Sequence, residues 1–432
     1  MRLGANKMDA KKVLFYGGIA TLFLLSALVF VFNGARSIGI FKVNFFKDFY
    51  FRWQECAYTL HGINPIDTLY GKAPVNAEIG QLPDMAGTIP WGYTMGNLFV
   101  FGFLPYKAAV VLGVILFASI TVYTFIRIYI YARTKCSRLY SAIATLLIFF
   151  NPIWVYTFGF GNMGGICCCM ILLAIFNMEK HPYLSGALFA FAMLKPQLTA
   201  LFFISLFLQK RWKTLFSAIG IVSFFWALTS VITKTSPIKM LFETGKQGME
   251  TYQDGNFGIF YILYAADVTS KRTSVILSAI LGVCVVLIFS AIILKNERLK
   301  NNLLFFYSVP AVASTFWFYK QPHDLIIIFI LALATLEFVF RDGATMRKYI
   351  FFSTSAFVYG LSDIPGRILA LIAATKLGYN WEKEVAWLSS INSIGMYIIW
   401  LIWFLMLWLM QVDNKLSRHI QKVLKKVKIH GV

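Results

Sequence analysis

The chain has 432 residues, of which 59% are hydrophobic, 17% aromatic and only 14% charged. Soluble domains carry about 25% charged residues, so this composition excludes a cytosolic enzyme, a secreted domain and a disordered protein. The 40 Lys and Arg residues outnumber the 19 Asp and Glu residues, but they lie in short blocks between long apolar runs. That distribution indicates membrane topology, and we expect no nucleic-acid partner.

Long apolar runs predict about twelve transmembrane helices, because a bilayer core of about 30 Å needs roughly 20 apolar residues. The sequence therefore predicts an all-α integral membrane protein that forms a single polytopic domain over 1–432. The predicted spans lie near 13–33, 108–131, 140–158, 164–178, 184–194, 196–208, 214–233, 274–294, 303–317, 324–340, 349–361 and 387–410.

Basic blocks set the predicted orientation, since loops rich in Lys and Arg stay in the cytoplasm. The basic blocks all fall on the cytoplasmic side only if the apolar stretch 90–105 re-enters the membrane or lies in its interface. Both termini are then cytoplasmic, and 34–107 is a long first outer loop. The basic segment 411–432 is predicted to be a cytoplasmic tail that binds membrane lipids of the inner leaflet.

Residues 45–60 read FFKDFYFRWQECAYTL and predict an amphipathic helix that lies in the outer interface. Its polar face carries Asp48, Arg52 and Glu55. Two interpretations stay open for this face. It is either a solvated ladder of salt bridges or a catalytic face on which Asp48 acts as a general base.

Lys195 and Pro196 interrupt an apolar run over 184–208. Proline cannot continue a helix cleanly, so the pattern predicts a hairpin of two short helices with Lys195 at its outer turn. A lysine in apolar surroundings is costly and marks a functional site by default. Lys195 therefore either snorkels from a helix end or binds a phosphate group as a point charge.

The predicted outer turn 314–324 reads STFWFYKQPHD. Trp317, Lys320 and His323 form an aromatic and charged cluster there with Asp324. Such a cluster suits a sugar phosphate, because aromatic faces stack on the sugar while Lys and His contact the phosphate. The alternative is an interfacial aromatic belt with ordinary loop charges.

Three segments of the chain resemble glycosyltransferase family 87 of the GT-C superfamily, which comprises multi-span enzymes that use polyprenyl-phosphate sugars. The first is DFYFRWQECAYTLHGINPIDTLY at 48–70, and the second runs from GNMGG through the Lys-Pro pair to QKRWK at 161–213. The third is the outer turn with Trp317 and His323. Five residues separate this Trp from this His, whereas the family has them close together, and Ile89-Pro90-Trp91 stands where the family has Tyr-Pro-Pro.

The resemblance implies a GT-C-type bundle that transfers a mannose-like hexose, with inversion, from a polyprenyl-phosphate donor to a lipid or glycan hydroxyl. The site would face the outside of the cell membrane, with Asp48 as its acid–base residue and with no metal or other cofactor. A D-x-D motif, usual in metal-held nucleotide-sugar sites, is missing from the sequence. The expected substrate-binding residues are Lys195, His323, Arg52, Tyr50, Trp317, Lys320, Asn162 and Gln197.

Two other functions stay open at this point. A lipid-linked sugar flippase or transporter is disfavoured because the sequence has no internal repeat. A polysaccharide polymerase is disfavoured because we would expect its Arg and His cluster in one late outer loop, whereas here an acidic residue leads an early loop.

Overall fold

The computed structural model of the chain describes residues 46–82, 89–134, 138, 141–142, 145–146, 152–251, 259–260, 263–264, 266–317, 322–341, 351 and 381–412. Within these residues the secondary structure is helical and includes no strand, as the composition predicts. The predicted span 13–33, nearly all of the run 349–361 and the tail beyond residue 412 lie outside the described residues. The elements are α2 (Lys47–Leu60), α3 (Pro65–Leu69), α4 (Pro90–Asn97), η2 (Phe101–Phe103), α5 (Tyr106–Arg133), α7 (Pro152–Phe160), α8 (Met163–Asn177), α9 (Pro182–Ala192), α10 (Pro196–Leu208), α11 (Trp212–Thr233), α12 (Pro237–Thr251), α14 (Lys271–Leu294), α15 (Glu297–Lys300), α16 (Leu303–Ser314), η3 (Pro322–Ile328), α17 (Phe329–Arg341) and α20 (Trp381–Val412).

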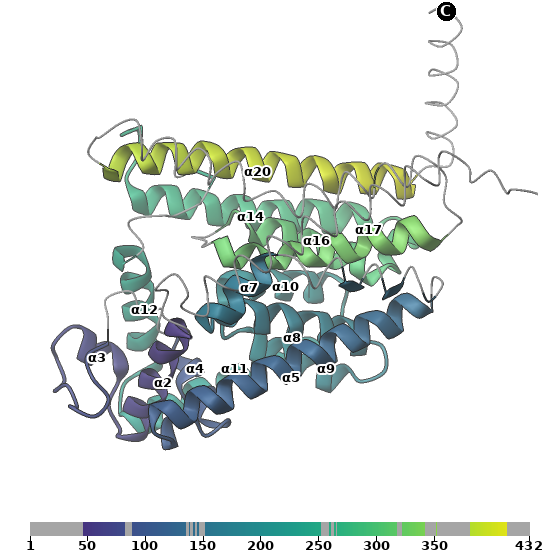
Figure 1. Cartoon of the computed structure of the whole chain (residues 1–432). Helices are drawn as coiled ribbons and strands as arrows, with labels where there is room; N and C mark the ends of the chain where they lie inside the picture. The colour runs from purple at the N-terminus through teal and green to yellow at the C-terminus, as the bar shows by residue number, and fades with distance from the viewer. Residues whose placement is uncertain are drawn as a thin grey trace, which may run out of the picture.

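The helices lie side by side in layers and make one bundle (Figure 1). In this view α20 and α14 form the uppermost layer, α16 and α17 lie beneath them, and α7, α8 and α10 lie in the middle above α5. The short helices α2, α3, α4 and α12 gather at one end of the bundle. The candidate site lies at this end.

Four helices are long and apolar enough to cross a membrane: α5, α11, Arg272–Leu294 of α14 and Ile394–Gln411 of α20. Four further predicted spans form shorter apolar helices, namely α8, α9, α10 and α16. The chain is therefore a helical, multi-pass membrane protein, although twelve helices of spanning length are not present among the described residues. The reason is visible in α8 and α16, which are buried along almost their whole length. Their apolar residues pack against protein on every side, so their composition does not report a length across lipid.

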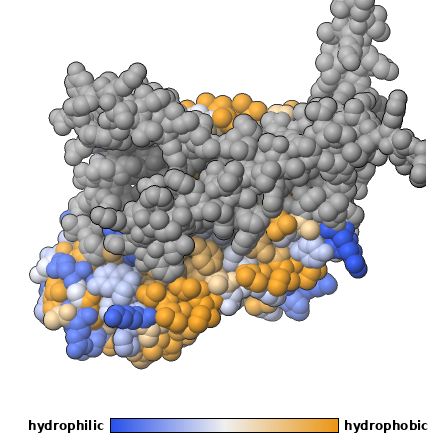
Figure 2. All heavy atoms as spheres, viewed as in Figure 1, coloured by the Kyte–Doolittle hydropathy of each residue, from blue (hydrophilic) through white to orange (hydrophobic). Residues whose placement is uncertain are grey.

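Helix α5, the longest candidate span in the first half of the chain, has one face buried in the bundle and one face exposed. Its buried face has mainly small or apolar residues four positions apart: Ala109, Gly113, Phe117 and Thr121. Its opposite face exposes large apolar side chains: Val111, Ile115, Val122, Ile126 and Ile130. In the space-filling view, hydrophobic side chains form a band on the lower surface between more hydrophilic ends (Figure 2). An apolar belt of this kind faces lipid in a membrane protein.

Helices α9 and α10 form the hairpin that the Lys-Pro pair predicts. The far end of the hairpin is closed by Arg211, whose Nη1 donates to Glu179 Oε2 over 3.1 Å. Lys195 therefore lies at the tip of the hairpin, between the last residue of α9 and the first residue of α10.

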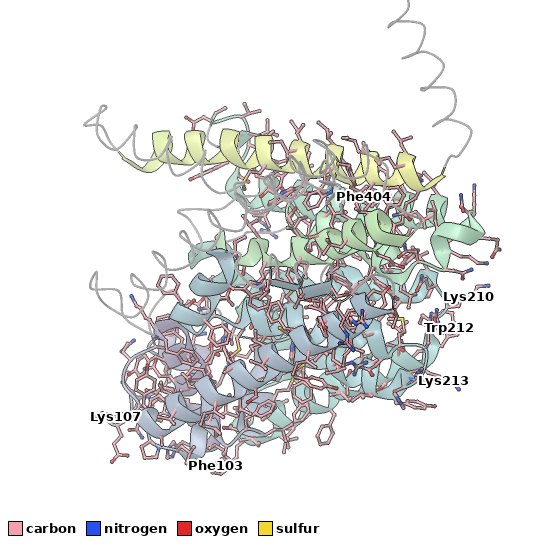
Figure 3. The ribbon with its side chains drawn as sticks, turned by 45° about the vertical axis from the view of Figure 1, so that its right-hand side comes forward. Phe103, Lys107, Lys210, Trp212, Lys213 and Phe404 are labelled. Carbon is pink, nitrogen blue, oxygen red and sulfur yellow. The ribbon has the colours of Figure 1, made fainter. Side chains whose placement is uncertain are left out.

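Basic loops gather at the end of the bundle opposite to α2. Loop 209–213 contacts loop 178–181 through Arg211 and Glu179, and it contacts loop 295–302 through Gln209 and the Lys300 carbonyl. Lys210, Trp212 and Lys213 lie at this end, whereas Phe103 and Lys107 lie at the other (Figure 3). Basic residues outnumber acidic ones in these three loops.

The ambiguous stretch 90–105 contains only α4, of eight residues, and η2, of three. Eight helical residues extend about 12 Å, which is too short to cross a core of about 30 Å. α4 packs instead between α2 and α11: Asn97 Nδ2 donates to the Cys56 carbonyl over 3.0 Å, and Thr94 Oγ1 donates to the Phe225 carbonyl over 2.9 Å. The place of this segment in the outer interface stays a prediction.

Candidate functional site

The start of α2 is fixed against the turn between α7 and α8. Phe46 has a left-handed φ of 60°, and its N–H donates to the Gly159 carbonyl over 2.7 Å. Its ring lies against Gly161, where a Cβ would come within 2.8 Å of the ring and where φ is +64°. Only glycine fits this position without strain. The contact brings Asp48, in the first turn of α2, next to Asn162.

Asn162 joins Asp48 to the N-terminus of α8. Its Oδ1 accepts the N–H of Gly164 over 2.8 Å and so caps the helix. Its Nδ2 donates to Asp48 Oδ2 over 2.7 Å. Asp48 is half-buried, and within the described part of the chain its other oxygen, Oδ1, accepts no hydrogen bond. Asp48 Oδ1 is therefore available to accept a hydrogen bond from a substrate.

Lys195 reaches the same asparagine from the tip of the α9–α10 hairpin. A residue that precedes proline avoids the helical conformation, and Lys195 accordingly has φ −135° and ψ 78°. The break turns its side chain toward α8, where Nζ donates to Asn162 Oδ1 over 2.8 Å. Lys195 is only 8% exposed, so it does not snorkel to solvent.

The Lys195 ammonium also forms an ion pair with Asp324 of η3, whose side chain is completely buried. A buried charge is costly unless it is paired and hydrogen-bonded. Four residues from four parts of the chain thus form one continuous set of hydrogen bonds, from Asp48 through Asn162 and Lys195 to Asp324. We call this set the polar chain.

Three other predicted site residues, namely Tyr50, Trp317 and Gln197, take part in hydrogen bonds outside the polar chain. The Tyr50 hydroxyl donates to the Ile79 carbonyl over 3.1 Å, and its ring stacks on Trp53. Trp317 Nε1 donates to the backbone carbonyl of Gln197 over 2.7 Å. This bond ties the end of α16 to the start of α10, so Trp317 helps to hold the hairpin tip that carries Lys195.

Arg52 and Glu55 form an ion pair within α2, with 2.6 Å between Nη1 and Oε2. Glu55 is buried, so the interpretation of this face as a solvated ladder is wrong for Glu55. Burial raises the pKa of Glu55 to about 7, against the opposing attraction of Arg52. Both Arg52 and Lys195 lie within electrostatic range of the Cys167 thiol in the first turns of α8. The two cations therefore approach the same region.

Lys320 lies outside the described residues, and the structure describes the backbone of His323 but not its side chain. His323 directly precedes Asp324 in η3. The pairing of Asp324 with Lys195 was missed from the sequence; the available signal was an acidic residue at the start of the apolar run 324–340. Within the described ranges, no three His, Cys, Asp or Glu side chains come together as metal ligands.

Comparison with protein families gives a match over residues 95–318 to the model of glycosyltransferase family 87. The match covers just over half of the chain. The chain belongs to glycosyltransferase family 87. It is thus a membrane glycosyltransferase, as the resemblance implied, with a helical fold that is consistent with the GT-C superfamily. None of the curated proteins searched matches it.

The family match contains part of the polar chain of this glycosyltransferase. Asn162 and Lys195 lie within residues 95–318, as do Gln197 and Trp317. The helix with Asp48 precedes the matched residues, and η3 with Asp324 follows them.

Proposed function

We propose that this glycosyltransferase moves a mannose-like hexose from a polyprenyl-phosphate donor to a hydroxyl of a lipid or glycan acceptor, with inversion at C1. Asp48 is the general base of the transfer. The observation that carries the proposal is the free oxygen of Asp48: Oδ2 is held by Asn162 over 2.7 Å, and Oδ1 accepts no hydrogen bond among the described residues. A general base needs an acceptor atom within hydrogen-bond reach of the hydroxyl that it deprotonates.

In the transfer the acceptor hydroxyl loses its proton to Asp48 as its oxygen attacks C1 of the sugar. The bond between C1 and the phosphate oxygen breaks, and its electron pair leaves with the polyprenyl phosphate. Negative charge then grows on the leaving phosphate. Lys195 donates two of its three N–H bonds to Asn162 and Asp324, which leaves a third for a phosphate oxygen. A preorganised cation of this kind stabilises the transition state.

The position of the candidate site supports the proposed donor class. Asp48 and Lys195 lie in a bundle with an apolar outer belt, at the end that carries the amphipathic helix α2. A polyprenyl tail can lie along such a belt while its sugar phosphate reaches the polar end. The basic loops lie at the opposite end, and positive loops stay in the cytoplasm. We therefore place the site at the outer face of the cell membrane, with both termini in the cytoplasm.

The flippase and polymerase alternatives have less support. The chain belongs to a family of transferases, and Asp48 and Lys195 meet at one end of the bundle through Asn162. A transporter would instead hold its substrate near the bilayer midplane between related halves.

The test is a transfer assay with Asp48→Asn. Membranes that contain the wild-type protein are offered radiolabelled polyprenyl-phosphate mannose, polyprenyl-phosphate glucose or a nucleotide sugar, and label is measured in the acceptor fraction. We expect transfer from a polyprenyl-phosphate donor and a loss of about 10²–10⁴-fold in Asp48→Asn, because an amide cannot take the proton.

The matched control is Asp67→Asn. Asp67 Oδ2 accepts an asparagine amide just as Asp48 does, from Asn64 over 3.3 Å, but it lies in α3, away from the polar chain. We expect this variant to keep wild-type transfer. Transfer from the nucleotide sugar alone would overturn the donor class, and full transfer by Asp48→Asn would overturn the assignment of the base.

A further inference from the structure

The Asn162 side chain makes three hydrogen bonds, which fix the orientation of its amide. Oδ1 accepts from Gly164 N and from Lys195 Nζ, each over 2.8 Å, and Nδ2 donates to Asp48 Oδ2 over 2.7 Å. A carboxylate accepts only from a donor, and an ammonium donates only to an acceptor. A flipped amide would place its oxygen against the Asp48 carboxylate and its N–H groups against the Lys195 ammonium. Only one orientation therefore satisfies this site.

This arrangement strengthens the bond to Asp48. The Asn162 amide lies between a cation and a carboxylate, and the cation pulls electron density toward Oδ1, so that Nδ2–H becomes a better donor. The N-terminus of α8, which Asn162 caps, adds its partial positive charge from the same side. Asn162 is also 92% buried, since its exposed fraction is 8%. Its Oδ1 uses both lone pairs within the protein, so this oxygen has no acceptor capacity left for a substrate.

We propose that Asn162 is a positioning residue: it holds Asp48 by Oδ2 so that Oδ1 faces the acceptor hydroxyl, and it ties this position to the Lys195–Asp324 ion pair. The inference rests on the proposed function and deepens it. It assigns Asn162 a different role from the substrate contact expected from the sequence. The groups that act on the acceptor and on the leaving phosphate are then set in place by one neutral amide.

Asn64 has the same local structure as Asn162, but its hydrogen bonds include none to a cation. It caps α3 by accepting from Ile66 N over 3.3 Å, and it donates to Asp67 Oδ2 over 3.3 Å. Both partners belong to its own segment and neither is a cation, although Asp67 itself pairs with Lys239, with 3.7 Å between Oδ1 and Nζ. Asn64 therefore provides a reference for an asparagine that caps a helix and holds an aspartate locally.

The decisive variant is Asn162→Asp. When this new carboxyl is protonated, its O–H can donate to Asp48 Oδ2 while its other oxygen accepts from Lys195, so the bridge is retained. When it is ionised, two carboxylates repel each other and the bridge is lost. Among the described side chains, the charged or titratable groups around this position are Asp48, Arg52 and Glu55 of α2, Cys167 of α8, Lys195 at the hairpin tip and Asp324 of η3.

We expect Asn162→Asp to lose about 10²-fold in transfer at pH 8, the scale of a displaced catalytic group. The ratio of its transfer rate to that of the wild-type protein should rise at least about tenfold between pH 8 and pH 5.5, as the proton shared by the two carboxyls restores the bridge. Asn162→Ser keeps a good helix cap but cannot bridge, so its loss should be similar at every pH.

The control is Asn64→Asp, which introduces the same group beside an aspartate at a helix cap; its transfer rate and pH profile should match the wild type. Melting in detergent at both pH values shows which variants fold. A ratio for Asn162→Asp that stays constant with pH, or wild-type transfer by Asn162→Ser, would overturn the inference alone. If the wild-type protein transfers no sugar from polyprenyl-phosphate donors, the proposed function fails, and this inference fails with it.

Discussion

Lys195 and Asp324 form a structural ion pair, and the proposed function gives Lys195 a chemical role as well. Their ion pair is buried, with 8% of Lys195 and none of Asp324 exposed. Burying two charges costs several kcal/mol, and pairing offsets that cost. Removal of one partner is therefore much more harmful to folding than replacement of both.

Lys195→Met and the double variant Lys195→Met/Asp324→Asn separate the two roles. We expect Lys195→Met to lower the free energy of unfolding by about 3–5 kcal/mol, because Asp324 loses its cation. The double variant should regain most of this stability but not sugar transfer, since no cation remains for the leaving phosphate. Melting in detergent and the transfer assay measure the two effects. Full transfer by the double variant would show that Lys195 has only a structural role.

Glu55 makes the stability of the folded protein depend on pH. Its pKa is about 7 in the folded state, against an ordinary value of 4.5, because it is buried. Between these values the folded protein binds more protons than the unfolded chain, so stability falls as pH rises from about 4.5 to 7 and then levels off. Each pKa unit corresponds to about 1.4 kcal/mol, so this contribution is on the order of 3 kcal/mol.

Glu55→Gln tests this dependence, because glutamine has no proton to lose. The variant should be clearly more stable than the wild type at pH 8 and close to it near pH 5. Thermal unfolding in detergent across this range measures the difference. A difference that does not vary with pH would mean that Glu55 does not titrate in this range.

At the scale of elements, the position of Asp48 depends on close contacts between α2, α4 and η2. Gly102 in η2 lies against the backbone of α2, where a Cβ would come within 2.7 Å of the Cys56 carbonyl carbon. Asn97 reinforces this contact, since it donates to the Cys56 carbonyl and accepts the Gly102 N–H over 3.0 Å each. The second half of α2 is thus clamped to the segment that precedes α5.

We expect Gly102→Ala to lower the free energy of unfolding by about 1–3 kcal/mol, the usual cost of overpacking. The backbone of Cys56 cannot yield as a flexible side chain would, so α2 must move and sugar transfer should fall as well. Gly220→Ala in α11 is the control, because a Cβ there meets no atom within 4 Å. It should stabilise the helix by up to about 1 kcal/mol. Equal stability of the two variants would contradict a tight contact between η2 and α2.

At the scale of the whole molecule, the two ends of the bundle differ in charge and in structure. One end has loops 178–181, 209–213 and 295–302, in which the basic residues together outnumber the acidic ones. The other has the short helices α2, α3, α4 and α12 and the candidate site. Basic loops stay in the cytoplasm, so the proposed orientation places the site outside.

Introduced cysteines test this orientation. Glu78 and Asn301 are both exposed. Glu78 lies in the segment that Tyr58 of α2 binds at the Gly80 carbonyl, and Asn301 lies in loop 295–302 at the opposite end. In a variant whose Cys136 and exposed Cys284 are replaced by serine, Glu78→Cys should react with a membrane-impermeant maleimide added to intact cells. Asn301→Cys should react only after the cells are opened. Labelling of both from the same side would contradict the orientation, without bearing on the chemistry of the site.

Sequence reasoning reached the class of protein and named part of the candidate site for physical reasons that are local. Lys195 was evident because a charge beside a proline interrupts an apolar run, and Asp48 because it lies on the polar face of an amphipathic helix. Arg52, Tyr50 and Trp317 were named for their residue types, but the hydrogen bonds that the structure gives them lie outside the polar chain. Residue type alone does not show which neighbouring group in the folded protein a side chain will bond to.

The sequence by itself determined that the chain is helical, crosses a membrane and breaks at Lys195, because hydropathy and proline geometry act over a few neighbouring residues. Only the tertiary structure decided that Asp48, Asn162, Lys195 and Asp324 meet. The bonds that join them link residues that are 114, 33 and 129 positions apart. Such contacts follow from how helices pack, and buried apolar helices such as α8 have no polar face to show which neighbour they will contact. The packing of Phe46 on Gly161 is an example: it fixes the distance from Asp48 to Asn162, and no periodicity in the sequence predicts it.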